Sequence, residues 1–436
     1  ANEMYTQIGI RSHGKGLFYK EPVTGDSLGN KSVFWIEPDC FILNIVFAWE
    51  QAVGKTTQAE AGMIGSHRFP MYRPINGSID IDYLISYLLT KRGTDILEAA
   101  SPGGAGRNRT LGQDRFMKSR IVLPPLDEQK KIAEILSTQD KAIELQGRKI
   151  EELKRFKKGC LEKMFPRKGQ KVPEKRFPGF TDDWEQRKLS DLAEKTYGGG
   201  TPTTSNEAYW NGDIPWIQSS DVVDGKLLGV EPRKWITQGG LNNSAAQLIP
   251  ENSIAIITRV GVGKLAFMPY SYATSQDFLS LSKLNVEPFF AVYACYKKLQ
   301  SELNAVQGTS IKGITKDELL AKSIMVPRYA EQQQIGAFFK QLDNLITLHQ
   351  RKLEEMKKQK KALMQLLLTG IVRVKAMNQK EIQEHHTKEA LKRIVDNSPN
   401  YTEQIKQDLK NIIDAGNTPE EILQATLLYF AALHLS

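Results

Sequence analysis

Residues 123–165 read LPPLDEQKKIAEILSTQDKAIELQGRKIEELKRFKKGCLEKMF, and residues 326–368 read VPRYAEQQQIGAFFKQLDNLITLHQRKLEEMKKQKKALMQLLL. The two segments align without gaps at a constant offset of 203 residues, and 14 of the 43 aligned positions are identical. The matches include Glu128 with Glu331, Asp140 with Asp343, and Lys157 with Lys360. A repeat that holds its register over this length indicates an internal duplication.

Each copy predicts one long helix, because proline precedes the start, Glu lies in the first turns and no proline interrupts the run. About 38 helical residues would span roughly 57 Å. Apolar residues recur at alternating steps of four and three, which is the spacing of a coiled-coil seam. We therefore expect the two helices to pair with each other in antiparallel orientation, although each could instead pack on its own domain. The seam positions include Ile132, Ile143, Ile150, Leu153, Ile335, Ile346, Leu353 and Met356.

The repeat divides the chain into six parts. Residues 1–122 and 184–325 contain short strand-like runs separated by turn clusters, which predicts two mixed domains and an α+β fold. The first of these domains is about 20 residues shorter at its start, so we expect it to lack its N-terminal beginning. The other parts are the helices 123–165 and 326–376, a basic linker at 166–183, and a small acidic helical tail at 377–436 that could be a fused segment.

Composition narrows the class of function. The chain has 436 residues with 59 Lys+Arg against 50 Asp+Glu, and the resulting charge of +9 favours a polyanionic partner. Its three cysteines are far apart, which excludes a disulfide framework and a zinc motif. The most apolar stretch, 422–435, is too short and too mixed to span a bilayer. We expect a cytoplasmic protein with no membrane partner.

Catalytic motifs are weak throughout the sequence. Val53–Thr57 reads VGKTT, like the end of a phosphate-binding loop, but Trp49 occupies the position where that loop needs glycine. This favours a hairpin or loop over a nucleotide site. The sequence offers no nucleophile with a matching base and no tandem metal-ligand cluster. We therefore expect no catalytic residue, no metal and no directly bound cofactor.

Basic and polar loop residues are the remaining candidates for function. Arg107 and Arg109 lie on a glycine-rich loop, and Lys312 aligns with Arg109 at the same offset of 203. Arg259 and Lys264 flank a glycine turn that follows a strand-like run. Such side chains can donate to phosphates or to guanine edges, although each could also belong to an ordinary surface turn. The polar candidates for base reading are Thr201, Thr203, Ser219, Ser220 and Gln276.

Several motifs together resemble the DNA specificity subunit of type I restriction–modification systems. They are WEQRKL at 184–189, YGGGTPT at 197–203, YWNGDIPWIQSSD at 209–221, TRVGVGKL at 258–265, and PxxxEQxxI at both 124–132 and 327–335. The resemblance covers about residues 5–376. It implies two target-recognition domains separated by paired helices, which would read an asymmetric bipartite site in double-stranded DNA.

The resemblance also implies the partners. Two modification subunits that carry S-adenosylmethionine would bind the helix seams and methylate adenine at N6, and two restriction subunits would use ATP and Mg for cleavage. The chain itself would be a non-catalytic subunit. Two alternatives remain open at this point: a specificity region detached from a single-chain restriction–modification enzyme, and a coiled-coil scaffold that binds no DNA.

Overall fold

A computed structural model describes residues 3–29, 32–103, 109–305, 313–371, 373–374, 392, 395–396 and 402–415. The chain forms two compact units. Unit 1 comprises Ala1–Asp140 with Gln359–Ser436, and unit 2 comprises Lys141–Lys358. Both units mix helices and short strands, so the α+β class is confirmed.

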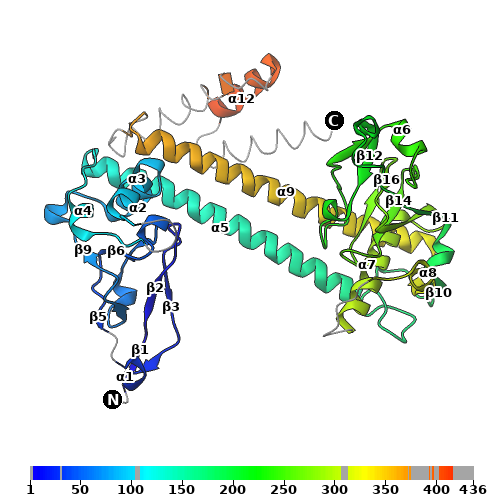
Figure 1. The fold of residues 1–436 in the computed structure, drawn as a ribbon, viewed down its shortest axis with the longest axis horizontal. Helices are drawn as coiled ribbons and strands as arrows, with labels where there is room; N and C mark the ends of the chain where they lie inside the picture. The colour runs from blue at the N-terminus through cyan, green and yellow to red at the C-terminus, as the bar shows by residue number, and fades with distance from the viewer. Residues whose placement is uncertain are drawn as a thin grey trace. The chain divides into compact units, whose positions relative to one another are not determined.

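Unit 1 contains short strands that pair in antiparallel ladders, together with helices (Figure 1). Within its described residues, β6 lies between β7 and β9, and the pairs β1–β4, β2–β3 and β5–β8 are separate ladders. The strands are β1 Met4–Tyr5, β2 Ile8–Ile10, β3 Leu17–Tyr19, β4 Val23–Thr24, β5 Val33–Trp35, β6 Phe41–Leu43, β7 Val53–Lys55, β8 Ile64–Ser66 and β9 Met71–Tyr72. The helices are α1 Gly25–Leu28, η1 Ala48–Glu50, η2 Gln58–Glu60, η3 Ile75–Gly77, α2 Ile81–Leu88, α3 Lys91–Ala100, α4 Gln113–Met117 and α12 Glu403–Ala415.

Unit 2 is built around two sheets. Among its described residues, one sheet has the order β11-β17-β14-β15 and the other has the order β13-β12-β16, while β10 pairs with β18. The strands are β10 Glu185–Lys188, β11 Ala193–Gly198, β12 Trp210–Ile217, β13 Lys234–Ile236, β14 Ser253–Ile257, β15 Leu265–Met268, β16 Ala273–Thr274, β17 Phe278–Leu284 and β18 Ser323–Val326. The shorter helices are η4 Leu189–Leu192, η5 Glu207–Tyr209, η6 Ser219–Asp221, α6 Gln238–Asn242, α7 Pro288–Ala305 and α8 Lys316–Leu320.

Helix α7 covers one face of the four-stranded sheet and forms the main core of unit 2. Phe290 and Tyr293 on α7 are fully buried and pack with sheet residues such as Ile254 and Leu281. Trp184 and Phe165 join the same core, because Phe165 stacks on Phe290 with ring centroids 5.7 Å apart. The WEQRKL motif therefore has a structural role: its tryptophan packs in the core of unit 2, and the residues after it form β10.

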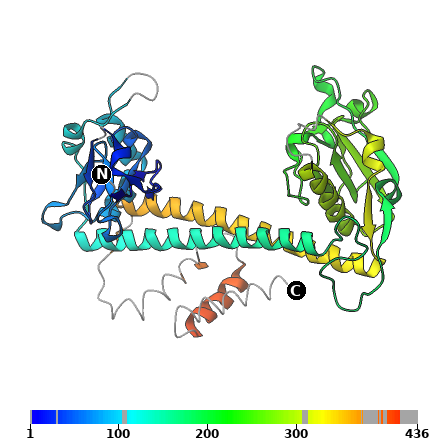
Figure 2. The same ribbon diagram turned by 90° about the horizontal axis from the view of Figure 1, so that it is seen from below.

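The repeated segments form the long helices α5, Leu126–Lys163, and α9, Tyr329–Leu368. Helix α9 ends where Gly370 adopts φ 74°, a left-handed conformation that glycine reaches without strain. In unit 1, Ile132 and Leu136 of α5 pack with Leu367 and Leu368 of α9. In unit 2, the C-terminal part of α5 lies beside the N-terminal part of α9 in both views (Figures 1 and 2).

The predicted seam positions lie on the inward faces of these helices. Ile132, Ile150, Ile335 and Ile346 are each at most 8% exposed. The other four positions are half-buried: Ile143, Leu153, Leu353 and Met356. Within the described ranges, no helix is both long enough and apolar enough to cross a membrane.

Candidate nucleic-acid interface and helix junctions

Several strands of unit 2 end at one edge, where their loops gather. Ile217 at the end of β12 lies opposite Thr274 at the end of β16, and Ile257 at the end of β14 lies opposite Phe278 at the start of β17. The Ser275 N–H donates to the carbonyl of Ile217 at 2.9 Å. The loops that carry the candidate residues Thr201, Thr203, Ser219, Ser220, Arg259, Lys264 and Gln276 all leave from this edge. We call these loops the second face.

The second face brings together residues that are far apart in sequence. The Thr201 hydroxyl donates to the Gln276 side-chain oxygen at 2.7 Å, although 75 positions separate them. Both side chains are exposed, as are those of Thr203 and Ser220. Ser219 is half-buried at the start of η6. These groups form a polar surface with hydroxyl and amide atoms available for hydrogen bonds.

The glycine turn of the second face is a tight hairpin between β14 and β15. Gly261 and Gly263 adopt φ 93° and 90°, and the Ile257 N–H donates to the Lys264 carbonyl at 2.9 Å. Arg259 is exposed at the start of this turn, whereas Lys264 is half-buried with its side chain beside Gly261. An exposed guanidinium on a short hairpin is placed to meet a phosphate or a base edge.

Two glycines allow the loop after β11 to pack closely against this edge. A Cβ at Gly199 would lie 1.9 Å from the Ser275 carbonyl oxygen, and one at Gly200 would lie 2.3 Å from the backbone of Ala245. A Cβ at Gly198 would meet no atom within 4 Å. The second and third glycines of the GGG run are therefore required by packing, and they hold Thr201 beside Gln276.

The first domain contains one described candidate. Arg109 is half-buried, and its guanidinium lies over the Trp49 ring at 5.5 Å from the centroid. Arg107 and Lys312 lie outside the described residues. Val53–Lys55, the start of the VGKTT run, forms strand β7 paired with β6, so the expectation of a hairpin there is confirmed.

The repeated Glu-Gln pair has a role that its sequence did not reveal. Gln129 donates to the Pro124 carbonyl at 2.9 Å and accepts from the Asp80 N–H at 3.0 Å, at the start of α2. Gln332 does the same with the Pro327 carbonyl at 2.8 Å and the Glu287 N–H at 2.9 Å, at the start of α7. Each glutamine thus joins a long helix to the first turn of a helix in the adjoining domain.

The glutamates of this pair bind arginines that follow the other long helix. In unit 2, Glu331 is 1% exposed at its side chain and makes two contacts of 2.7 Å with Arg176, beyond the end of α5. In unit 1, Glu128 makes contacts of 2.7 and 2.8 Å with Arg373, beyond the end of α9. Arg373 lowers the pKa of Glu128, since its guanidinium stabilises the carboxylate. We call the Gln contact and the Glu–Arg pair together a junction.

A buried triad attaches the second domain to both helices. Lys157 of α5 contacts Asp343 of α9 at 2.6 Å, and the Tyr293 hydroxyl of α7 donates to the same carboxylate at 2.6 Å. The Lys157 ammonium also lies over the Tyr293 ring at 5.4 Å. Burial and the Asp343 charge raise the pKa of Tyr293, which keeps its hydroxyl protonated as a donor. The repeat-equivalent pair in unit 1, Lys360 with Asp140, is more exposed.

Residues at equivalent repeat positions also meet in unit 2. Gln146 and His349 differ by 203 positions, and the Gln146 amide lies 2.9 Å from His349 Nδ1 and donates to its carbonyl at 2.8 Å. Burial lowers the pKa of His349, and the charges of Lys149 and Lys352 add to this effect. A contact between equivalent positions is expected when two copies of one helix pair in opposite directions.

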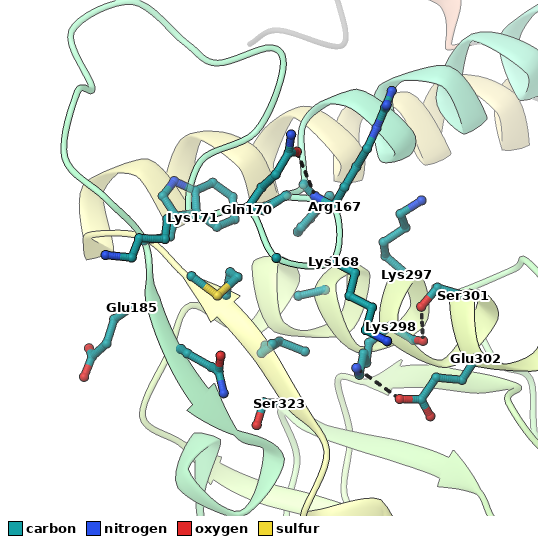
Figure 3. A pocket seen from close by; sticks show the side chains of 18 residues that line it. Arg167, Lys168, Gln170, Lys171, Glu185, Lys297, Lys298, Ser301, Glu302 and Ser323 are labelled. Carbon is teal, nitrogen blue, oxygen red and sulfur yellow. Dashed lines mark hydrogen bonds and ion pairs between the residues drawn. The ribbon is translucent and has the colours of Figure 1, made fainter. Parts of the chain in front are cut away.

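A basic groove of about 1010 Å³ lies beside the linker in unit 2 (Figure 3). Its wall includes Arg167, Lys168, Lys171 and Lys297, together with Lys298, which pairs with Glu302 at 3.0 Å. None of the candidate DNA-binding residues lines it. Within the described part of the chain, no group of three or more His, Cys, Asp or Glu side chains is arranged to hold a metal ion.

The fold and the loop face define a class: a duplicated α+β protein in which each loop-rich unit is joined to the long helices of the repeat. The family model of the type I restriction modification DNA specificity domain matches residues 37–155 and 181–358, together more than half of the chain. The chain therefore belongs to this family and has a role in DNA sequence specificity, so the resemblance seen in the sequence is confirmed.

Relatives named as type I specificity subunits match different shares of the chain. A Methanocaldococcus jannaschii protein assigned as the MjaX type I specificity subunit is 27% identical over 312 residues, which are 70% of this chain and 71% of the relative. The Escherichia coli EcoR124I/EcoR124II specificity subunit is 30% identical over 37% of this chain and 41% of its own length. A solved structure from work on complex assembly and conformational transition of the type I R-M system shares the fold. Its TM-score is 0.54 at 18% identity, with 84% of this chain and 92% of that chain covered.

Proposed function

We propose that this chain reads an asymmetric bipartite target in double-stranded DNA and directs partner subunits to it. The observation that carries the proposal is the second face. Its loops start from one edge of unit 2 and together carry seven candidate residues. Exposed guanidinium, hydroxyl and amide groups on short, tightly packed loops are suited to phosphate and base-edge contacts. The first domain carries different side chains, so its half-site should differ in sequence.

The paired helices would set the spacing between the half-sites. Half-sites one helical turn apart, about 34 Å, lie on one face of the DNA, and a long helix can impose such a distance. In this proposal the two target-recognition domains are separated by α5 and α9, which pair as an antiparallel coiled coil. The contacts of Gln146 with His349 and of Lys157 with Asp343 support that pairing.

The catalytic work would belong to the partners. Two modification subunits carrying S-adenosylmethionine would bind α5 and α9 and methylate adenine at N6 after flipping it from the duplex. Two restriction subunits would cleave DNA with ATP and Mg. This chain would supply sequence specificity without a catalytic residue of its own, in the cytoplasm.

The first test is the substitution Arg259→Ala in the chain bound to its modification subunits. Binding to target DNA should weaken, and the dependence of log affinity on log salt should fall by about one unit if Arg259 meets a phosphate. Arg187→Ala is the matched control, because that half-buried arginine on β10 already pairs with Glu185 at 2.7 Å. Unchanged affinity and salt dependence in Arg259→Ala would remove this residue from the interface.

Mapping of N6-methyladenine in cells that express the complex would test the whole proposal. A bipartite asymmetric motif with one fixed spacer length is the expected result. A complex that forms but neither methylates nor binds DNA would instead favour a scaffold role.

A further inference from the structure

The second face has a backbone signature that can be sought elsewhere. The Thr258 N–H donates to the Asp277 carbonyl at 2.8 Å, and the Ile314 N–H donates to the Thr258 carbonyl at 2.8 Å. Thr258 follows β14, which pairs with both β15 and β17. Thr258, at the end of the central strand β14, is therefore hydrogen-bonded on one side to Asp277, just before β17. On the other side it is hydrogen-bonded to Ile314, in the segment after α7.

Unit 1 repeats this signature in a sequence that hardly resembles unit 2. The Ile45 N–H donates to the Arg68 carbonyl at 3.0 Å, and the Leu111 N–H donates to the Ile45 carbonyl at 2.8 Å. Leu111 and Ile314 are themselves related by the offset of 203. Ile45 follows β6, which pairs with both β7 and β9, as β14 does with β15 and β17. Hence β6, β7 and β9 correspond to β14, β15 and β17.

This correspondence locates a first face. The connection between β6 and β7, residues 44–52, takes the place of the glycine turn that carries Arg259. Arg68 takes the place of Asp277, the residue after Gln276. Arg68 is exposed, and within the described part of the chain no carboxylate pairs with its guanidinium or with that of Arg109.

The first face presents its cation differently from the second. Trp49 lies in η1 on the β6–β7 connection, and its indole N–H donates to the Val46 carbonyl at 3.0 Å, which fixes the ring. The Arg109 guanidinium lies over that ring. A cation–π contact with an aromatic face reduces the freedom of the guanidinium and leaves its other N–H groups available for a bidentate contact.

We infer that Arg109 and Arg68 contact the first half-site of the DNA and that Trp49 is a positioning residue for Arg109. The inference rests on the proposed DNA-binding function and deepens it by assigning residues to one half-site. A guanidinium with a fixed plane suits the paired O6 and N7 acceptors of guanine in the major groove. Arg68 lies in the turn between β8 and β9, where its carbonyl accepts from the Ile45 N–H of the connection, and it supplies a second cation to the same face.

The test uses the full chain in complex with its modification subunits and a DNA library randomised at either half-site. Arg109→Ala should lower base selectivity at one or more positions of one half-site by about tenfold, and leave the other half-site unchanged. Trp49→Leu should lower selectivity at the same positions, whereas Trp49→Phe, which keeps an aromatic face, should restore most of it. A purely structural role for Trp49 would not produce loss confined to the positions that Arg109 reads.

Arg73→Ala is the matched control, because this exposed arginine follows β9 while Arg68 precedes it, and it pairs with Glu37 at 3.3 Å. Selectivity unchanged by both Arg109→Ala and Trp49→Leu, while Arg259→Ala alters the other half-site, would overturn this inference and leave the proposed function standing. A wild-type complex that selects no sequence at all would overturn both.

Discussion

Removal of the Lys157 ammonium is the sharpest test of the packing in unit 2. In Lys157→Met the Asp343 carboxylate would keep the Tyr293 hydroxyl but lose its cation. The side chains of Lys157 and Asp343 are only 10% and 14% exposed. Breaking a buried, hydrogen-bonded ion pair by removal of one partner costs about 3–5 kcal/mol. We expect about 3 kcal/mol, because the hydroxyl still compensates part of the carboxylate charge.

The duplication supplies a matched control. Lys360→Met removes the repeat-equivalent cation, whose side chain and that of Asp140 are 22% and 57% exposed. Exposed pairs contribute about 0–1 kcal/mol, so this variant should lose less than about 1 kcal/mol.

The assay is unfolding by heat and by urea, followed by tryptophan fluorescence. Four of the six tryptophans, Trp184, Trp210, Trp216 and Trp235, lie in unit 2, so the signal reports chiefly on that unit. A loss of about 3 kcal/mol in a unit of this size lowers Tm by roughly 6–12 °C. Equal and small losses in both lysine variants would refute the argument that burial makes the Lys157 pair matter. Replacing both members of the pair with apolar residues, Lys157→Met with Asp343→Leu, should recover part of the loss.

Three further outcomes follow from the same structure. Gly199→Ala should abolish most DNA binding by the complex and lower stability by about 2 kcal/mol or more, since its Cβ has no room, whereas Gly198→Ala should bind as the wild type does. Glu331→Gln should destabilise unit 2 by about 2–3 kcal/mol and Glu128→Gln should cost unit 1 about 1 kcal/mol, because the arginine partners are 15% and 60% exposed; urea titration measures both. The pKa of His349 is below its ordinary value of 6.5 in the folded chain, so the unfolded chain binds the proton more readily. Stability should therefore fall as the pH drops below about 6.5, and the decrease should be smaller in His349→Gln.

The helices were the most predictable part of the fold. A step pattern of four and three, held over the same length in both copies, identified inward positions such as Ile132 and Ile346, which are buried. This worked because helix periodicity is a local property of the sequence. The position where α9 ends was harder to predict, because the helix stops before Gly370 although apolar residues continue to Ile371 and Val374.

The junctions and the faces could not be foreseen from local pattern. Glu331 pairs with Arg176, which lies 155 positions away in the sequence, and Thr201 donates to Gln276, which lies 75 positions away. The sequence showed this glutamate as part of a repeated motif, but the motif did not predict which residue pairs with it. The correspondence of β6 with β14 was hidden for another reason: the side chains of the two domains have diverged, and only the backbone hydrogen bonds preserve the relation.

The glutamine of each junction has a consequence for how such proteins can diversify. Gln129 and Gln332 each make hydrogen bonds to main-chain groups. Each donates to a proline carbonyl and accepts from a main-chain N–H at the start of a helix in the adjoining domain. Peptide groups are present whatever side chains surround them. A recognition domain of unrelated sequence could thus be exchanged at this junction, provided that it offers a main-chain N–H at the start of a helix. New DNA targets could then arise by shuffling whole domains, with the helical frame left untouched.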